Sequence, residues 1–223
     1  MNARFWLLEP AQTDTMATTT SEYQSIVCAA GHRRARRQKI GELAVNFPAG
    51  RHLSDFEWTW LSDTLISEHA LRVLQRHKVT GFAVGSVTAE FEKPDTRKPP
   101  PFFELVVTGW GGMAAPAAGV KVTDACLDCR FRQYTIADPT RLFDPTAWDG
   151  SDLFMVWPLP GFRFASDRLA GILRQERISG VKLVPPAQIE VKPGAKLGPG
   201  PLDAWMPQSR ALQIGRHFDV LLG

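Results

Sequence analysis

The alternation of apolar and polar positions in the last third of the chain predicts a strand, a helix and a second strand in succession. Residues 153–157 form an apolar run with β-branched and aromatic members, which is typical of a buried strand. Ser166 has a side chain suited to cap a helix, and the apolar positions that follow at helical spacing are Leu169, Ile172 and Leu173. Gly180 stands where this helix ends, and residues 181–184 begin a second extended run.

A similar pattern occurs earlier in the chain. Residues 55–60 parallel residues 152–157, and Ser67 then aligns with Ser166. The same alignment pairs Glu68 with Asp167, Val73 with Ile172, Leu74 with Leu173, Val79 with Ile178, Thr80 with Ser179 and Gly81 with Gly180. Two unrelated helices with ordinary caps would share part of this pattern, but the number of matched positions favours an internal duplication.

These patterns predict an α/β or α+β protein in which two related strand–helix–strand units share one mixed sheet. The chain of 223 residues is long enough to bury a substantial core. We expect a single globular domain over residues 1–223, with the two related halves at about 50–110 and 150–191. The N-terminal segment 1–49 is expected to pack against a cysteine-containing knuckle at 120–135.

The remaining segments have simpler signals. In chain order they predict a strand over 1–10, a surface loop over 12–22, a helix over 61–77, a strand over 81–91, an exposed connection over 93–101, a buried strand over 102–108, a flexible glycine-rich connection over 109–119, turns over 138–148, a Pro/Gly-rich stretch over 185–201 and a closing strand or short helix over 208–223.

Composition and charge set outer limits on the class of protein. The chain is 44% hydrophobic and 22% charged, which is ordinary for a globular protein. No apolar run approaches the roughly 20 residues that a membrane-spanning helix needs. The run Phe5–Leu8 is too brief for a signal peptide, so we expect a cytoplasmic protein. A net charge of +3 gives no general argument for nucleic-acid binding.

One dense charge run stands out from this background. Residues Arg33–Lys39 contain five basic residues and no acidic one. A run of this kind is most often a solvated face, although it could also attract an acidic partner or contact phosphates. No aromatic residue is interleaved with the arginines to stack on bases.

The three cysteines form the principal chemical signal. Cys126 and Cys129 have the spacing that lets two thiolates reach one Zn²⁺ ion from a tight turn. Cys28 and His32 have a usable chelate spacing and could complete a Cys₃His site. Alternatively, such a site has been lost, with Cys28 a small buried apolar residue and His32 exposed, or the thiols never bound a metal. A redox role is less favoured, because the residues after Cys129 alternate as in a strand rather than opening a helix.

The sequence contains no recognisable catalytic constellation. The five histidines are scattered, and neither a Gly-x-Ser-x-Gly nor a His-Glu-x-x-His pattern occurs. The clustered carboxylates stand before Pro, Gly or a strand, where turns and caps favour Asp; they are Asp138, Asp144, Asp149 and Asp152. Four tryptophans lie in or beside loops and could either anchor a partner or pack in the core; they are Trp110, Trp148, Trp157 and Trp205. We therefore expect a protein that is not an enzyme.

Several of these short motifs together resemble one protein family. They are the opening Arg4-Phe5-Trp6-Leu7-Leu8-Glu9, a cysteine motif at residue 28, Cys-x-x-Cys at 126–129, and Asp152-Leu153-Phe154 followed by Ser166-Asp167 and Ile178-Ser179-Gly180-Val181. The combination is similar to the myxobacterial double-CXXCG motif family of immunity proteins, over most of the chain to about residue 191.

This resemblance implies a cytoplasmic protein that binds and blocks a cognate toxin without catalysis of its own. It also implies a cysteine pair in each of two motifs and hence a zinc site. Here the second motif keeps Cys126 and Cys129, with Arg130 in place of the family's glycine. The first motif keeps only Cys28, because Gly31 replaces the second cysteine and His32 the glycine. The expected metal ligands are therefore Cys28, His32, Cys126 and Cys129.

Three classes of function remain to be distinguished. The first is an immunity-type protein that neutralises a toxin by covering its active cleft, and it has no membrane partner. The second is a zinc-knuckle nucleic-acid-binding or regulatory protein that uses the basic run Arg33–Lys39. Its binding to nucleic acid would weaken steeply with salt. The third is a hydrolase or transferase, which would require a deep pocket lined by convergent polar groups.

Overall fold

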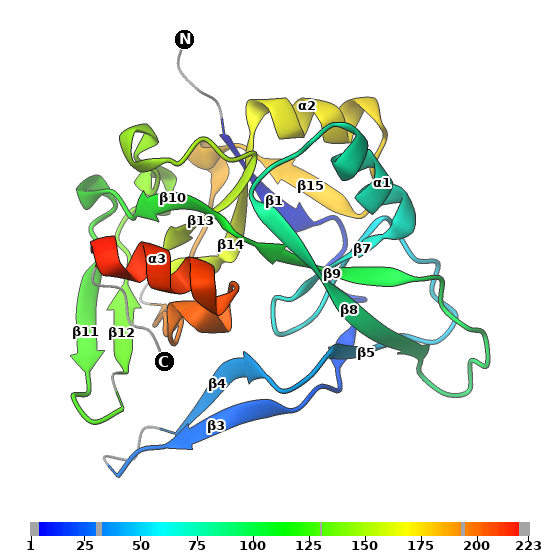
Figure 1. Ribbon diagram of the computed structural model, residues 1–223, viewed down its shortest axis with the longest axis horizontal. Helices are drawn as coiled ribbons and strands as arrows, with labels where there is room; N and C mark the ends of the chain where they lie inside the picture. The colour runs from blue at the N-terminus through cyan, green and yellow to red at the C-terminus, as the bar shows by residue number, and fades with distance from the viewer. Residues whose placement is uncertain (1–4, 30–32, 130, 193–194, 219–223) are drawn as a thin grey trace.

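The computed structural model describes residues 5–29, 33–129, 131–192 and 195–218, which form two mixed sheets, two further hairpins and three α-helices (Figure 1). The five-stranded sheet has the order β10 (Gly109–Met113), β13 (Leu153–Trp157), β14 (Leu159–Ser166), β1 (Phe5–Pro10) and β15 (Val181–Val184). Within it, β10 and β13 are parallel and the other neighbours are antiparallel.

The six-stranded sheet has the order β2 (Thr18–Thr19), β5 (Leu43–Phe47), β8 (Phe82–Phe91), β9 (Phe102–Val107), β7 (Thr64–Ser67) and β6 (Phe56–Trp58). Only β5 and β8 are parallel among its described pairs. Helix α1 (Glu68–Arg76) packs on β7 and β9, and helix α2 (Asp167–Gln175) packs on β14 and β1. Each sheet is thus covered on one side by one of these helices.

Two hairpins extend from this body. They are β3 (Tyr23–Val27) with β4 (Arg33–Lys39), and β11 (Lys121–Ala125) with β12 (Arg132–Thr135). Figure 1 shows the β3–β4 hairpin running beneath the body toward the turn between β11 and β12. Short 3₁₀ turns and helix α3 (Gln208–Phe218) complete the fold; the turns are Pro116–Ala118, Pro139–Arg141, Pro145–Ala147, Pro186–Gln188 and Leu202–Ala204.

The two units aligned in the sequence contain the same elements in the same order. One is β6–β7–α1–β8 and the other is β13–β14–α2–β15. In each sheet a further strand lies between the hairpin and the last strand of the unit. The order β6-β7-β9-β8 in one sheet therefore corresponds to β13-β14-β1-β15 in the other. All neighbouring strands in both orders are antiparallel. Strand β9 follows β8 in the chain, whereas its counterpart β1 comes from the N-terminal segment.

The helix caps also correspond between the units. The hydroxyl of Ser67 accepts a hydrogen bond from the backbone N–H of Ala70 at 3.1 Å, and the hydroxyl of Ser166 accepts one from Leu169 at 3.2 Å. Each cap satisfies a backbone donor in the first turn, which is why both helices begin at these serines.

The units are joined by a reciprocal exchange of backbone hydrogen bonds. The N–H of Phe56 donates to the carbonyl of Ser179 at 3.0 Å, and the N–H of Leu153 donates to the carbonyl of Thr80 at 3.0 Å. The hairpin of each unit therefore binds the turn that follows the helix of the other unit.

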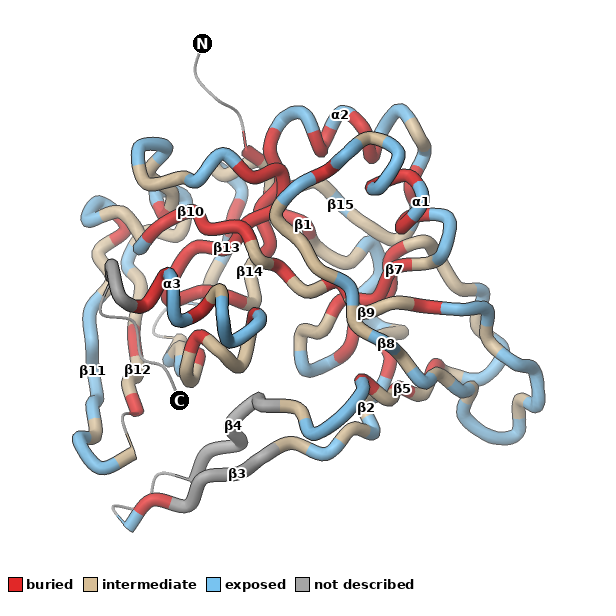
Figure 2. The backbone as a smooth tube through the Cα atoms, viewed as in Figure 1, coloured by how far each residue is buried: buried red, intermediate tan, exposed pale blue. Residues whose placement is uncertain are grey.

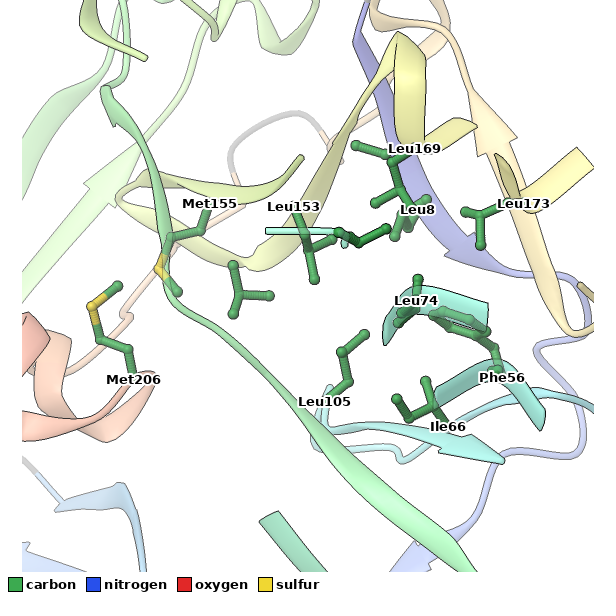
Figure 3. Packing of buried hydrophobic residues seen from close by; sticks show 14 of the residues in the cluster. Leu8, Phe56, Ile66, Leu74, Leu105, Leu153, Met155, Leu169, Leu173 and Met206 are labelled. Carbon is green, nitrogen blue, oxygen red and sulfur yellow. The ribbon is translucent and has the colours of Figure 1, made fainter. Parts of the chain in front are cut away.

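The core reflects the same exchange. The largest cluster of buried apolar residues takes members from both units; Figure 3 labels Phe56, Ile66, Leu74 and Leu105 from the first and Leu8, Leu153, Leu169 and Leu173 from the second. Two smaller clusters lie on the outer faces of the sheets, one around Phe154 and Phe164 and the other around Phe47 and Leu65. The buried segments in Figure 2 accordingly concentrate where the sheets meet under the helices.

The α+β class is confirmed, but the arrangement differs from expectation in one respect. The two units lie in two separate mixed sheets rather than in one shared sheet. The reason is that each hairpin pairs with a strand outside the aligned pattern, β9 in one case and β1 in the other.

Three local predictions are wrong. The surface loop expected over 12–22 contains strand β2, which pairs with β5, and Ala17 before it is fully buried. The helix expected over 61–77 begins only at Glu68, because residues 64–67 pair with β6 and β9 as strand β7. The flexible connection expected over 109–119 begins with strand β10, where glycine serves close packing rather than flexibility. A Cβ at Gly109 would overlap the carbonyl oxygen of Leu153, and one at Gly111 would overlap the ring of Phe154.

Candidate metal centre

The three cysteines converge from two hairpins that are distant in the sequence. Cys28 follows β3, whereas Cys126 and Cys129 lie in the turn between β11 and β12. Their Sγ atoms all lie within 4.8 Å of one another, and the Sγ atoms of Cys28 and Cys126 are 3.6 Å apart. None of the three forms a disulfide. The structure therefore brings together three of the four residues expected as ligands.

The local structure explains why Cys126 and Cys129 face a common point. The backbone N–H of Cys126 donates to the carbonyl of Phe131 at 2.8 Å, which closes the turn and leaves both cysteines on it. Phe131 and Tyr134 are buried, and Tyr134 exchanges two backbone hydrogen bonds of 2.8 Å with Leu197. The β11–β12 hairpin is thus anchored along β12, while every residue of β11 is exposed.

The β3–β4 hairpin brings the remaining cysteine, Cys28, into this turn. Cys28 is buried although it lies near the end of the hairpin. At the opposite end the hydroxyl of Tyr23 donates to the carboxylate of Asp63 at 3.4 Å, and the ammonium of Lys39 forms an ion pair with Glu104. The hairpin therefore contacts the body at its base and the β11–β12 turn at its other end.

The environment of Cys126 favours its thiolate. The backbone N–H of Cys129 lowers the pKa of the Cys126 thiol most strongly, burial opposes it, and the N–H of Asp128 and the thiols of Cys28 and Cys129 add to the lowering. The resulting pKa is about 7. Because the thiolate is the form that binds metal ions, the lowered pKa of Cys126 favours binding of a soft cation at this turn.

The donor set fits a metal ion. Tetrahedral thiolates around Zn²⁺, each at about 2.3 Å, stand roughly 3.8 Å apart. The 3.6 Å between the sulfurs of Cys28 and Cys126 is close to this spacing, and all three sulfurs lie within 4.8 Å of one another. Three thiolates leave one position of a tetrahedron for a further ligand. His32, the residue expected there, lies outside the described residues. The three cysteines can thus hold a metal ion.

The four carboxylates singled out in the sequence all bind nearby groups, two of them within their own turns and two across the fold. Asp138 and Asp144 cap the turns that follow them, by accepting the backbone N–H of Thr140 at 3.0 Å and of Thr146 at 2.9 Å. The capping interpretation of these two residues is confirmed. Asp149 accepts the N–H of Trp110 and pairs with Arg210, and Asp152 binds Thr80, Ser166 and Arg168.

The basic run Arg33–Lys39 forms strand β4. The side chains of residues 33–38 lie outside what the structure describes, so the expectation of a solvated face stays a prediction. Lys39 is the described member, and it pairs with Glu104 at the base of the hairpin.

The tryptophans singled out in the sequence mostly pack in the interior. Trp110 and Trp157 are buried, and Trp148 and Trp205 pack against apolar clusters. The exposed tryptophan is instead Trp60, with 60% of its surface accessible at the β6–β7 turn. No signal in its neighbourhood distinguishes it from the buried ones, because burial is decided by the partner strands.

Leu127 is a second exposed residue that the sequence patterns did not single out. It lies between Cys126 and Cys129, and 98% of its surface is accessible. One signal could have found it: when two cysteines of a Cys-x-x-Cys turn face a common point, the residue after the first cysteine is held away from that point. The turn therefore presents a large apolar side chain to solvent.

A small pocket of about 40 Å³ lies between the six-stranded sheet and the Leu202–Ala204 turn. Its polar lining comes from Asp63, Thr64, Glu104 and Arg163. A volume of this size accommodates a few water molecules. It lies at the base of the β3–β4 hairpin, where Asp63 and Glu104 already bind Tyr23 and Lys39.

Comparisons with known proteins add no family assignment: no protein-family model matches the chain, and no curated protein matches it significantly. Among the described residues, no helix is both long enough and apolar enough to cross a membrane.

Proposed function

We propose that the chain is an immunity-type binding protein that neutralises a protein toxin in the cytoplasm by covering the toxin's active cleft. The observation that carries this proposal is the exposure of Leu127 at the apex of the cysteine turn. Burying a leucine side chain contributes about 1.5–3 kcal/mol, so a partner that covers Leu127 gains binding energy that the free protein does not have.

The surroundings of Leu127 support a docking role. Val122 on the same hairpin is 53% exposed, and β11 offers a further row of accessible residues. Pre-organised surface groups bind more tightly than mobile ones, because less conformational entropy is lost on association. A turn fixed by three cysteines would present Leu127 in one position.

We propose Zn²⁺ as the ion held by Cys28, Cys126 and Cys129, with a structural role. Zinc bound to thiolates supplies cross-linking and no redox chemistry. In this protein it would fix the β11–β12 turn and the end of β3 relative to each other. Catalysis by the chain itself is not part of the proposed function.

Strand β4 supports a second candidate function. Its five basic residues could add electrostatic attraction to an acidic toxin, but they could also contact the phosphates of a nucleic acid. Nucleic-acid binding releases counterions and weakens steeply with salt, whereas a complex centred on Leu127 changes little. Binding measured at 50 and 200 mM salt, in the range where that slope is usually evaluated, separates the two candidates.

The direct test is co-expression with the product of the adjacent reading frame, which we expect to be the toxin. The wild-type chain should restore growth and bind the purified product in a calorimeter. Leu127→Ala should weaken binding about tenfold or more, since 1.4 kcal/mol corresponds to a factor of ten. Val84→Ala, at a 46% exposed position on β8, is the matched control and should bind as the wild type does. A wild-type chain that neither binds nor protects would refute the proposal.

A further inference from the structure

The attachment of the β3–β4 hairpin is unequal at its two ends. It forms a two-stranded sheet of its own rather than joining either main sheet. Among the described residues, the N–H of Ile40 donates to the carbonyl of Glu22 at 2.9 Å, Tyr23 binds Asp63, and Lys39 pairs with Glu104 at the base of the hairpin. Strand β4 also contacts the Leu202–Ala204 turn. These contacts require no ion.

At the opposite end the described contact with the β11–β12 hairpin is made by Cys28, whose sulfur lies 3.6 Å from that of Cys126. A contact between two thiols is weak, because S–H is a poor donor and sulfur a poor acceptor. Shared thiolate coordination of one ion is much stronger and fixes both sulfurs. The strength of the attachment at this end therefore depends on whether the ion is bound.

The ligand set differs from that of a self-contained knuckle. Cys126 and Cys129 come from one turn, whereas Cys28 lies 98 positions before Cys126 in the chain. An ion bound by all three joins two hairpins that no strand pairing connects. Because the first motif retains a single cysteine, Cys28 is the one thiolate through which the ion can hold the β3–β4 hairpin.

We infer that this ion acts as a clasp for the β3–β4 hairpin, fastening the hairpin to the β11–β12 turn when bound and leaving it attached only at its base when removed. The inference rests on the metal site of the proposed function and adds a regulatory consequence to it. Since β4 carries the basic run, the ion also determines where the backbone of that strand is presented to a partner.

The test is limited trypsin digestion of the reduced full-length protein with Zn²⁺ or with a chelator. The bonds after Arg33, Arg34, Arg36 and Arg37 lie in β4 and are potential cleavage sites. Zinc should slow their cleavage at least tenfold in the wild type. In Cys28→Ser, cleavage should proceed at the metal-free rate with or without zinc. Cleavage after Arg97, in the exposed β8–β9 connection, is the internal control and should not respond to zinc.

Cobalt substitution reports on the site separately. Co²⁺ bound by three thiolates should show strong sulfur-to-metal absorption, and Cys28→Ser should lose about a third of it while Cys126 and Cys129 still bind. If the wild type binds neither ion, the metal site itself is refuted. If the wild type binds zinc yet β4 is cleaved at the metal-free rate, the clasp is refuted and the metal site remains. Protection by chelation of the wild type, rather than by zinc, would also overturn the inference.

Discussion

The carbonyl oxygen of Phe56 occupies the space that a side chain on Gly180 would need. The same relationship holds with the two units exchanged, because a Cβ on Gly81 would overlap the carbonyl oxygen of Leu153. Both glycines also have left-handed backbone conformations, with φ of +81° at Gly180 and +88° at Gly81. Each glycine thus allows the hairpin of one unit to approach the turn of the other, which links the halves of the molecule.

Gly180→Ala should therefore destabilise the protein strongly. The new methyl group must displace the backbone at Phe56, and the left-handed conformation is itself unfavourable for alanine, so we expect a loss of about 3 kcal/mol in the free energy of unfolding. Urea unfolding measures this loss. Gly171→Ala is the control: it lies within α2 with open space around it, and should stabilise by up to about 1 kcal/mol. Equal effects at the two glycines would contradict the proposed close approach.

Asp55 links the units through its carboxylate. It accepts the backbone N–H of Ser179 at 3.0 Å and the hydroxyls of Ser179 and Ser67 at 2.8 Å each. Burial alone would raise the pKa of Asp55, but the Ser179 N–H, His69 and the two hydroxyls together lower it below its ordinary value of 3.8. Asp55→Asn should cost about 2 kcal/mol at pH 7, because hydrogen bonds to a charged group are lost.

The pH dependence has a defined sign. A lowered pKa in the folded state means that the stabilisation by Asp55 is present above pH 3.8 and is lost as the pH falls through the folded value. The wild type should therefore lose more stability than Asp55→Asn during acidification below pH 3.8. Asp14→Asn, at an exposed position, should follow the wild type. Parallel acid unfolding curves for all three proteins would argue against the role of Asp55.

Glu57 forms a buried ion pair in the first unit. Its side chain is inaccessible to solvent, and its Oε2 lies 2.6 Å from the Nη2 of Arg51. Burial raises the pKa of Glu57, while the N–H of Ser54 and the charge of Arg51 oppose the rise. Arg51→Ala would leave the carboxylate without its counter-charge and should cost about 3–5 kcal/mol at pH 7.

This penalty should shrink on acidification. The pKa of Glu57 is higher in the folded state than its ordinary value of 4.5. The folded state therefore favours the protonated carboxyl group, and this contribution to stability is complete below pH 4.5 and is lost as the pH rises through the folded pKa. Urea unfolding of Arg51→Ala at pH 7 and pH 5 measures the difference, and a larger loss at pH 5 would exclude this explanation. Arg72→Ala removes an exposed ion pair with Glu68, and should change stability by at most about 0.5 kcal/mol at either pH.

Metal binding should be visible in stability as well as in composition. Zinc in large excess over its dissociation constant should raise the unfolding temperature of the wild type, because the ion binds the folded site preferentially. Cys126→Ser removes one of the three thiolates and should reduce both the bound zinc and the thermal shift. Asp128→Asn, in the same turn but without a ligand sulfur, should keep both. Thermal unfolding with and without zinc, combined with elemental analysis, decides the outcome; an undiminished zinc content in Cys126→Ser would remove this residue from the site.

The amino-acid sequence by itself determined the local features of this protein. Local features depend on neighbouring residues, so they can be recognised from the sequence alone. They include the caps at Ser67 and Ser166, the helices that follow them, and the strands beginning near residues 82 and 181. The capping of turns by Asp138 and Asp144 is local for the same reason.

Only the tertiary structure decided which distant segments meet. Strand β1 completes the second unit from the far end of the chain, and the glycines of β10 belong to a strand because Leu153 and Phe154 leave no room for side chains. The sequence already named Cys28, Cys126 and Cys129 as candidate ligands, but only the positions of the two hairpins bring the three sulfurs within 4.8 Å of one another. Strand pairing and burial depend on partners far away in the chain, whereas caps and helix periodicity depend on residues within a few positions.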